Sequence, residues 1–193
     1  MVQESIGIVL KSIPYSESSL ISRIFTPEFG KISIIARGAK KAKGGNSAML
    51  EPMNIVEFQM NFNESKDLQI LREISIHQNL STIRANIKKM AIGLVMVEIL
   101  DKTTHQFDPA PILYRLIESS ISELNNLDIP DMVLFIFYLI QFSKYSGFNP
   151  VSESCHNCDR ELLSAFFNLQ SGFLDCENCR NLDSFNFDSS TFL

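Results

Sequence analysis

The sequence predicts an α+β protein with several domains: a small barrel of five strands, a helical domain, and an embedded module built around four cysteines. A change of hydrophobic period and the cysteine spacing carry this prediction. Up to about residue 80 the chain has the alternation and the β-branched, aromatic content of strands, and its apolar residues then follow the period of a helix. Strands followed by helices indicate two packed units and not an alternating βα fold.

Five stretches of the first eighty residues have strand character. They lie at residues 6–10, 19–25, 31–37, 56–60 and 68–76. In the last stretch Arg72 falls among the apolar residues Leu68, Ile70, Ile74 and Ile76, so we expect a bulge or an open barrel end there. Five short strands with loops favour a small barrel, but the pattern alone does not separate an OB-fold from an SH3-like barrel.

The first predicted helix follows His77, with Ser81 as its N-cap. Its apolar residues are spaced by fours and threes, which places them on one face. They are Ile83, Ile87, Met90, Leu94 and Val97. Between residues 90 and 100 only Glu98 is charged, so this helix is expected to be buried on most sides.

Two further helices are predicted at about 111–124 and 131–145. The second contains the longest apolar run of the chain, "MVLFIFYLI" at residues 132–140. This run is half the length that crosses a bilayer, so it predicts a buried helix. The N-terminus lacks the apolar stretch of a signal peptide, and we expect a cytoplasmic protein without a membrane partner.

The four cysteines form two pairs, Cys155-x2-Cys158 and Cys176-x2-Cys179, separated by seventeen residues. This is the spacing of a four-cysteine zinc site, in which each CxxC turn directs two thiolates at one point. Four thiolates leave no open position on the metal, so the spacing predicts one structural Zn²⁺ per chain. The alternatives are free thiols or a redox CxxC, but a redox pair normally lies in a βαβ context that is absent here.

Positive charge is concentrated near the N-terminus of an acidic chain. The net charge is −5, yet residues 1–50 hold seven Lys/Arg against three Asp/Glu. The run "RGAKKAKGG" at residues 37–45 predicts a loop that contacts DNA, because local potential governs such contacts. The alternative is an ordinary solvated loop. The candidate residues are Arg37, Lys40, Lys41 and Lys43, extended by Arg23, Lys31 and Lys11 in neighbouring strands.

Three stretches resemble one protein family. "GIVLKSIPYSESSLISRIFTPEFGKISIIARGAKKAK" is similar to the N-terminal signature of the RecO family of bacterial recombination mediators. "YSGFNPVSESCHNC" and "FFNLQSGFLDCENC" resemble the zinc motif of that family. The resemblance implies an N-terminal OB-fold barrel at residues 1–78, a central helical domain at 79–150, a zinc module at 151–182 packed on it, and a tail at 183–193.

The resemblance also implies a function. Members bind single- and double-stranded DNA, anneal complementary strands and act with RecR to help RecA replace single-strand binding protein (SSB). It implies metal ligands at the four cysteines, basic DNA-binding positions within residues 37–43, and association with the nucleoid. For the acidic SSB tail we expect a surface on the helical domain, where Arg84, Lys88 and Lys89 cluster.

Two other functional classes remain open. One is an adaptor that binds only proteins, which a DNA pull-down at low salt would distinguish. The other is a redox or hydrolytic enzyme that uses the cysteines, which metal analysis would distinguish. The sequence has no P-loop, no GxSxG and no dinucleotide-binding motif, so we expect no catalytic residues.

Overall fold

The computed structural model describes residues 1–41, 45–126, 130–148, 152–168, 170–181 and 184–187. Within them the chain runs through five strands, four helices and three further short strands. It divides into two units, Met1–Tyr138 and Leu139–Leu193, and the boundary falls inside the fourth helix.

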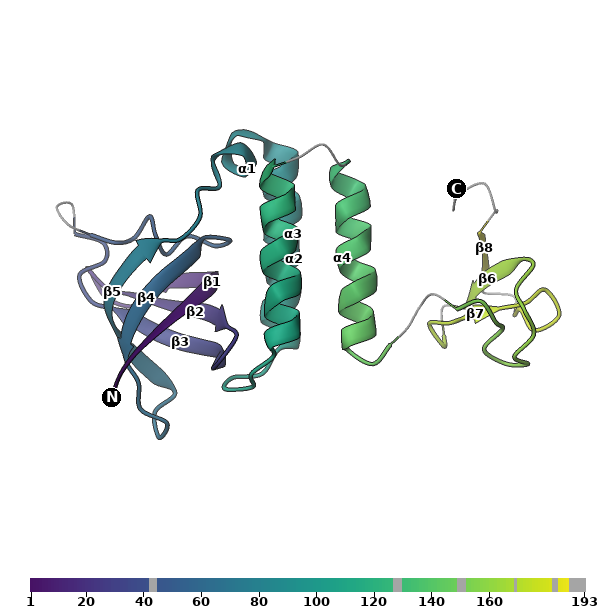
Figure 1. Cartoon of the computed structure of the whole chain (residues 1–193), viewed down its shortest axis with the longest axis horizontal. Coiled ribbons are helices and arrows are strands. Elements are labelled where there is room, and N and C mark those ends of the chain that lie inside the picture. Colours follow the sequence, from purple (N-terminus) through teal and green to yellow (C-terminus); the bar gives the residue numbers. More distant parts are fainter. Residues whose placement is uncertain (42–44, 127–129, 149–151, 169, 182–183, 188–193) are drawn as a thin grey trace. The chain divides into compact units, whose positions relative to one another are not determined.

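The first five strands close into a barrel (Figure 1). They are β1 (Val2–Pro14), β2 (Leu20–Thr26), β3 (Gly30–Ala36), β4 (Ile55–Asn61) and β5 (Leu68–Ile76). Their order around the barrel is β1-β2-β3-β5-β4, and β4 pairs back onto β1. The pairing of β3 with β5 is parallel, with Ser33 opposite Leu68, whereas the other pairs are antiparallel. This is the five-stranded barrel of an OB-fold, as expected.

A β-bulge on β5 accounts for Arg72. Gln59 of β4 pairs with Glu73, and the next residue, Met60, pairs with Leu71, so Arg72 is the extra residue. The predicted bulge is therefore confirmed. Because a bulge switches the face that a strand presents, the predicted common face of β5 is wrong in part: Ile74 packs on the barrel core together with Leu71.

The barrel interior is filled by side chains of all five strands and of the connection after β3. Its centre consists of apolar residues that are almost inaccessible to solvent, and their burial is the main source of stability for such a small barrel. They include Val9, Ile24, Ile32, Ile34, Leu50, Val56, Phe58 and Met60.

The helix predicted from Ser81 is two helices, α1 (Ser81–Ala85) and α2 (Ile87–Thr103). Asn86 breaks it, because its extended backbone cannot continue α1 and its side chain accepts hydrogen bonds from the N–H groups of Lys88 and Lys89. The break rotates the second segment relative to the predicted face. Ile87 is 72% exposed and Leu94 is 40% exposed, so the prediction that both are buried is wrong.

The remaining helices, α3 (Pro111–Asn126) and α4 (Asp131–Tyr145), begin where they were predicted. α2 packs against α3 and β1, and α3 also contacts β2, so α2 and α3 cover one side of the barrel. In α4, Leu134 and Tyr138 are buried, but Met132, Val133, Ile136 and Phe137 are exposed. The expectation of a fully buried α4 is therefore wrong. No helix of the described ranges has the length and apolarity needed to span a bilayer.

The second unit contains a three-stranded sheet in the order β7-β6-β8. The strands β6 (Ala165–Asn168) and β7 (Leu174–Asp175) form a hairpin between the cysteine pairs. The third strand, β8 (Ser184–Phe187), pairs antiparallel with β6 and lies in the segment that was predicted as a C-terminal tail.

Candidate metal centre and nucleic-acid interface

The four cysteine sulfurs lie in one cluster. Each Sγ lies within 4.8 Å of the other three, and the Sγ atoms of Cys158 and Cys176 are 3.7 Å apart. A tetrahedral zinc with Zn–S bonds of about 2.3 Å would hold its sulfurs about 3.8 Å apart. The cluster therefore has the dimensions and the donor set of a closed four-thiolate metal site, which leaves no position for a substrate.

Local hydrogen bonds shape both CxxC turns. In the first, the Asp159 N–H donates to the Cys155 carbonyl at 2.9 Å, and Asp159 has the positive φ of 56° that reverses the chain. In the second, the Cys179 N–H donates to the Cys176 carbonyl at 3.0 Å. The His156 N–H donates to the Leu174 carbonyl of β7 at 2.9 Å, so the hairpin holds the first turn beside the second.

The pKa values of the Cys155 and Cys179 thiols are shifted in opposite directions. Burial raises the pKa of the Cys155 thiol, but hydrogen bonds from the N–H groups of Cys176, Asn157 and Cys158 lower it overall to about 6. The neighbouring thiols, Cys176 first, raise the pKa of Cys179 to about 12. Adjacent thiolates repel each other, so a cation is needed for all four sulfurs to lose their protons together. The residues therefore fit a metal ion.

A buried carboxylate beside the cluster was missed by the sequence analysis. Asp175 is fully buried, and its two oxygens accept hydrogen bonds from the side-chain amides of Asn157 and Asn168, both at 2.9 Å. It thereby ties the first CxxC turn to the hairpin. Its position directly before Cys176 was visible in the sequence, but its burial depends on the fold.

The basic run lines a groove at one end of the barrel, with a volume of about 640 Å³. Arg37 and Lys41 come from the run, and Lys66 comes from the connection between β4 and β5. Tyr15, which is 63% exposed, contributes an aromatic ring from the β1–β2 turn. The apolar lining residues are Ile35, Leu68 and Ile70.

Contacts of residues 38–40 anchor the first part of the basic run. Ala39 is only 2% exposed and packs into the barrel core, while Gly38 turns the chain with φ +70°. The Lys40 N–H donates to the Ser18 carbonyl at 3.0 Å, and its Nζ donates to the Ser16 carbonyl at 3.1 Å. The run is therefore held against the β1–β2 turn. Lys43 lies outside the described residues.

Two predicted DNA-binding residues, Lys31 and Arg23, instead pair with a carboxylate of the protein itself. Lys31 is 7% exposed, and its Nζ donates to the Asp101 carbonyl oxygen at 2.6 Å and lies 3.8 Å from the Asp101 carboxylate. Arg23 pairs with the same carboxylate at 2.8 Å. Lys31 is therefore not available to a phosphate, and Arg23 is engaged in joining the barrel to α2. Lys11 is exposed on β1 and pairs with Arg23 in register, outside the groove.

The chain matches known proteins over almost its whole length. The family model described as "Recombination protein O N terminal" matches residues 1–80, and "Recombination protein O C terminal" matches residues 84–192. A protein named DNA repair protein RecO from Bacillus pumilus is 31% identical over 185 residues, which cover 96% of this chain and 71% of that protein. Its namesake from Listeria monocytogenes is 31% identical over 179 residues, covering 93% and 69%.

The chain belongs to the RecO family of DNA repair proteins. The two candidate sites fall into different family models: the barrel groove lies in the RecO N-terminal match, and the four cysteines lie in the RecO C-terminal match.

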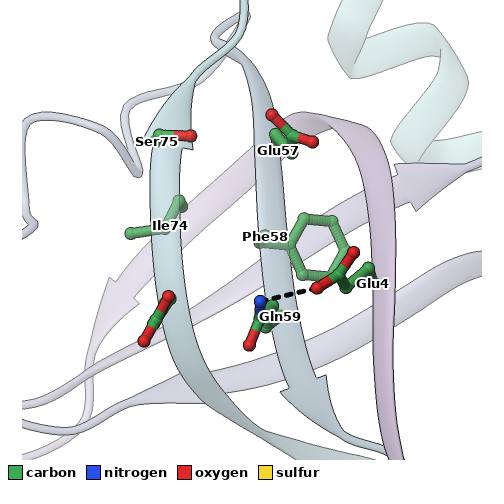
Figure 2. Close-up of a pocket in the computed structure, with 7 residues that line it drawn as sticks. Glu4, Glu57, Phe58, Gln59, Ile74 and Ser75 are labelled. Atoms are coloured by element: carbon green, nitrogen blue, oxygen red, sulfur yellow. Dashed lines mark hydrogen bonds between the residues drawn. The ribbon is translucent and has the colours of Figure 1, made fainter.

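The RecO barrel separates its charges. A cavity of about 180 Å³ on the outer wall of β1, β4 and β5 is lined by three glutamates, Glu4, Glu57 and Glu73. Figure 2 shows this wall, where the Gln59 Nε2 donates to the Glu4 Oε1 at 2.6 Å. Carboxylates there repel a phosphate backbone, while the groove beside Arg37 attracts it. This arrangement explains how an acidic chain can present a basic surface.

Two of the three basic residues expected to bind SSB tails, Arg84 and Lys89, contact other residues of the protein. Arg84 pairs with Glu51 at 2.8 Å and donates to the Asn54 side chain at 2.7 Å. Lys89 is 8% exposed and donates to the Leu124 carbonyl at 3.1 Å, where it caps the C-terminal end of α3. Only Lys88 of the three is exposed without a contact of this kind among the described residues. These residues therefore do not form the free basic face that was expected.

Proposed function

We propose that this chain is a recombination mediator that binds single- and double-stranded DNA and anneals complementary strands. The observation that carries the proposal is the groove in which Arg37, Lys41 and Lys66 lie beside the exposed ring of Tyr15. Single-stranded DNA is typically bound by cations that follow the backbone and by aromatic rings on which bases stack. A duplex uses the cations alone, so both substrates share one surface.

The cysteine cluster has a structural role in this proposal. One Zn²⁺ per chain would be held by Cys155, Cys158, Cys176 and Cys179 and would fold the second unit around it. Nothing in the proposal is catalytic. Following the family resemblance, the partners are RecR, which acts with this protein in loading RecA, and the acidic tail of SSB on the DNA to be loaded. The site of action is the nucleoid in the cytoplasm.

A salt series tests the DNA-binding surface. Each phosphate neutralised on a single strand contributes about −0.7 to the slope of log affinity against log salt concentration. Replacing Arg37, Lys41 and Lys66 with Ala should flatten that slope by up to about 2 units and slow annealing in parallel. Tyr15→Ala should weaken binding to single strands more than binding to duplexes, because only unpaired bases stack on the ring.

The matched control removes the same number of charges elsewhere. Lys88, Lys102 and Arg115 are exposed on helices, and their replacement with Ala changes the net charge by the same amount. If the control variant flattened the slope as much as the groove variant, DNA would bind through general charge and not in the groove. If wild type did not bind DNA at low salt, the chain would act as a protein adaptor.

A further inference from the structure

A second cavity of about 240 Å³ lies at the opposite end of β3 from the basic groove. Three phenylalanine rings line it: Phe29 from the β2–β3 turn, Phe62 from the end of β4, and Phe107 from the connection between α2 and α3. The ring centroids of Phe29 and Phe62 are 4.7 Å apart, and those of Phe62 and Phe107 are 6.4 Å apart. We refer to this cavity as the phenylalanine cage.

The backbone holds the phenylalanine cage in place. The Phe107 N–H donates to the Lys31 carbonyl at 3.0 Å, and the Phe62 N–H donates to the Met1 carbonyl at 2.9 Å. Gly30 has φ +65°, and a Cβ there would overlap with the backbone of Asp108, so the α2–α3 connection lies directly on the β2–β3 turn. All three rings also pack on the barrel core. The cage is therefore preformed, and a ligand would not need to order it.

The rim of the cage is negative. Glu28 and Glu64 line it together with Pro109, and none of the described lining residues carries a positive charge. The Ser5 hydroxyl donates to the Glu28 Oε2 at 2.8 Å and fixes this carboxylate at the rim. The Met1 ammonium donates to the Phe62 carbonyl oxygen at 3.2 Å and is not one of the lining residues.

These features select a cation. Aromatic faces attract cations through their quadrupole, and two carboxylates at the rim add to that attraction. A nucleobase could stack on the rings, but its phosphates would then meet Glu28 and Glu64. The volume is below the range of about 300–1,000 Å³ typical of small-molecule sites, which fits one side chain.

We propose that the phenylalanine cage receives an arginine side chain from a basic segment of a protein partner. A guanidinium is weakly hydrated and planar, so it stacks on aromatic faces while its N–H groups reach carboxylates. Phe29 lines the cage and Arg37 lines the basic groove. These two residues are roughly 25 Å apart along an extended strand. A partner in the cage would therefore leave the groove free for DNA.

The test uses the full chain and two peptides that differ only in charge. Acetyl-Gly-Arg-Gly-amide is titrated into the protein, and so, in a separate experiment, is a peptide in which citrulline replaces arginine. The aromatic signals of Phe29, Phe62 and Phe107 are followed by NMR. The arginine peptide should shift these signals, and citrulline should bind several-fold more weakly. Phe62→Leu keeps an apolar side chain but removes the ring, and it should weaken binding between about 2-fold and 30-fold.

A matched carboxylate variant separates the cage from general acidity. Glu64→Gln should weaken arginine binding, whereas Glu57→Gln, the same change on the acidic wall of β1, β4 and β5, should leave it unchanged. Equal effects of these two variants would overturn the proposal, as would equal binding of both peptides or no shifts at about 20 mM peptide. Shifts of the cage signals by a thymidine oligonucleotide would assign the cage to DNA instead.

Discussion

Replacing Asp101 with Asn removes the charge that joins the barrel to α2 while keeping the size of the side chain. Asp101 is 6% exposed and is the partner of both Lys31 and Arg23. Removing one partner of a buried ion pair typically lowers the free energy of unfolding by about 3–5 kcal/mol. Arg23 is 35% exposed at its side chain and can return to water, so most of the loss comes from Lys31.

We expect a loss of about 3 kcal/mol, at the lower end of that range. The Lys31 Nζ keeps its hydrogen bond to the Asp101 backbone carbonyl at 2.6 Å, and the Asp101 Oδ1 has no hydrogen-bond partner among the described residues. Both facts reduce what the carboxylate contributes. Adding Lys31→Met to the Asp101→Asn variant should recover much of the loss, because the unpaired buried ammonium is then gone.

The assay is a urea titration in which the amide signals of β2 and β3 report on the first unit alone. An Asp101→Asn variant within 0.5 kcal/mol of wild type, roughly the effect of a surface substitution, would refute the argument. So would an equal loss in the presence and absence of Lys31→Met, because Lys31 would then not be the cause.

The same pair predicts a dependence on pH. Burial lowers the pKa of Lys31 in the folded state, while the Asp101 carboxylate raises it and so limits the shift. Between the folded pKa and the unfolded value of 10.5 the unfolded chain binds more protons, so stability rises with pH in that interval. Asp101→Asn widens the interval, and the deficit of the variant relative to wild type should therefore shrink as the pH approaches 10.5.

Two further variants test the metal centre and the turn beside the phenylalanine cage. Cys176→Ser should release the metal and loosen residues 152–181 while the barrel signals remain, as measured by metal analysis and NMR; full metal retention would contradict the four-thiolate site. Gly30→Ala should lower the free energy of unfolding by about 2 kcal/mol or more, because φ is +65° and the new Cβ meets Asp108. An unchanged urea midpoint for Gly30→Ala would show that the turn is not constrained in this way.

The features that local sequence encodes were predicted well. Alternation, together with β-branched and aromatic content, identified the five barrel strands, and the CxxC spacing identified the four sulfurs that the structure brings within 4.8 Å. The charge of Arg72 in an apolar series predicted either a bulge or an open barrel end, and the register of β4 and β5 shows the bulge. The cap at Asn86 is also a local feature, since Asn is among the preferred residues at helix starts.

Features set by distant residues were not predictable in this way. Lys31 belongs to the same basic segment as Arg37, yet it is buried because Asp101, seventy positions away, provides its acceptor. Lys66 and Tyr15 join the groove only because β3 pairs with β5 and the β1–β2 turn lies beside them. No pattern within one segment reveals such neighbours. A count of charges therefore does not distinguish a buried, paired cation such as Lys31 from a surface cation such as Arg37.

The parallel pairing of β3 with β5 also affects how the protein is made. Strands β1, β2 and β3 are joined by consecutive hairpins and can pair early. The barrel closes only when β5 has been made and Leu68 can pair with Ser33. Long-range pairing of this kind is slow relative to local contacts, and chains fold from the N-terminus during synthesis. A nascent chain therefore carries Arg37 and Lys41 before the groove exists, and the groove is complete only after β5 has left the ribosome.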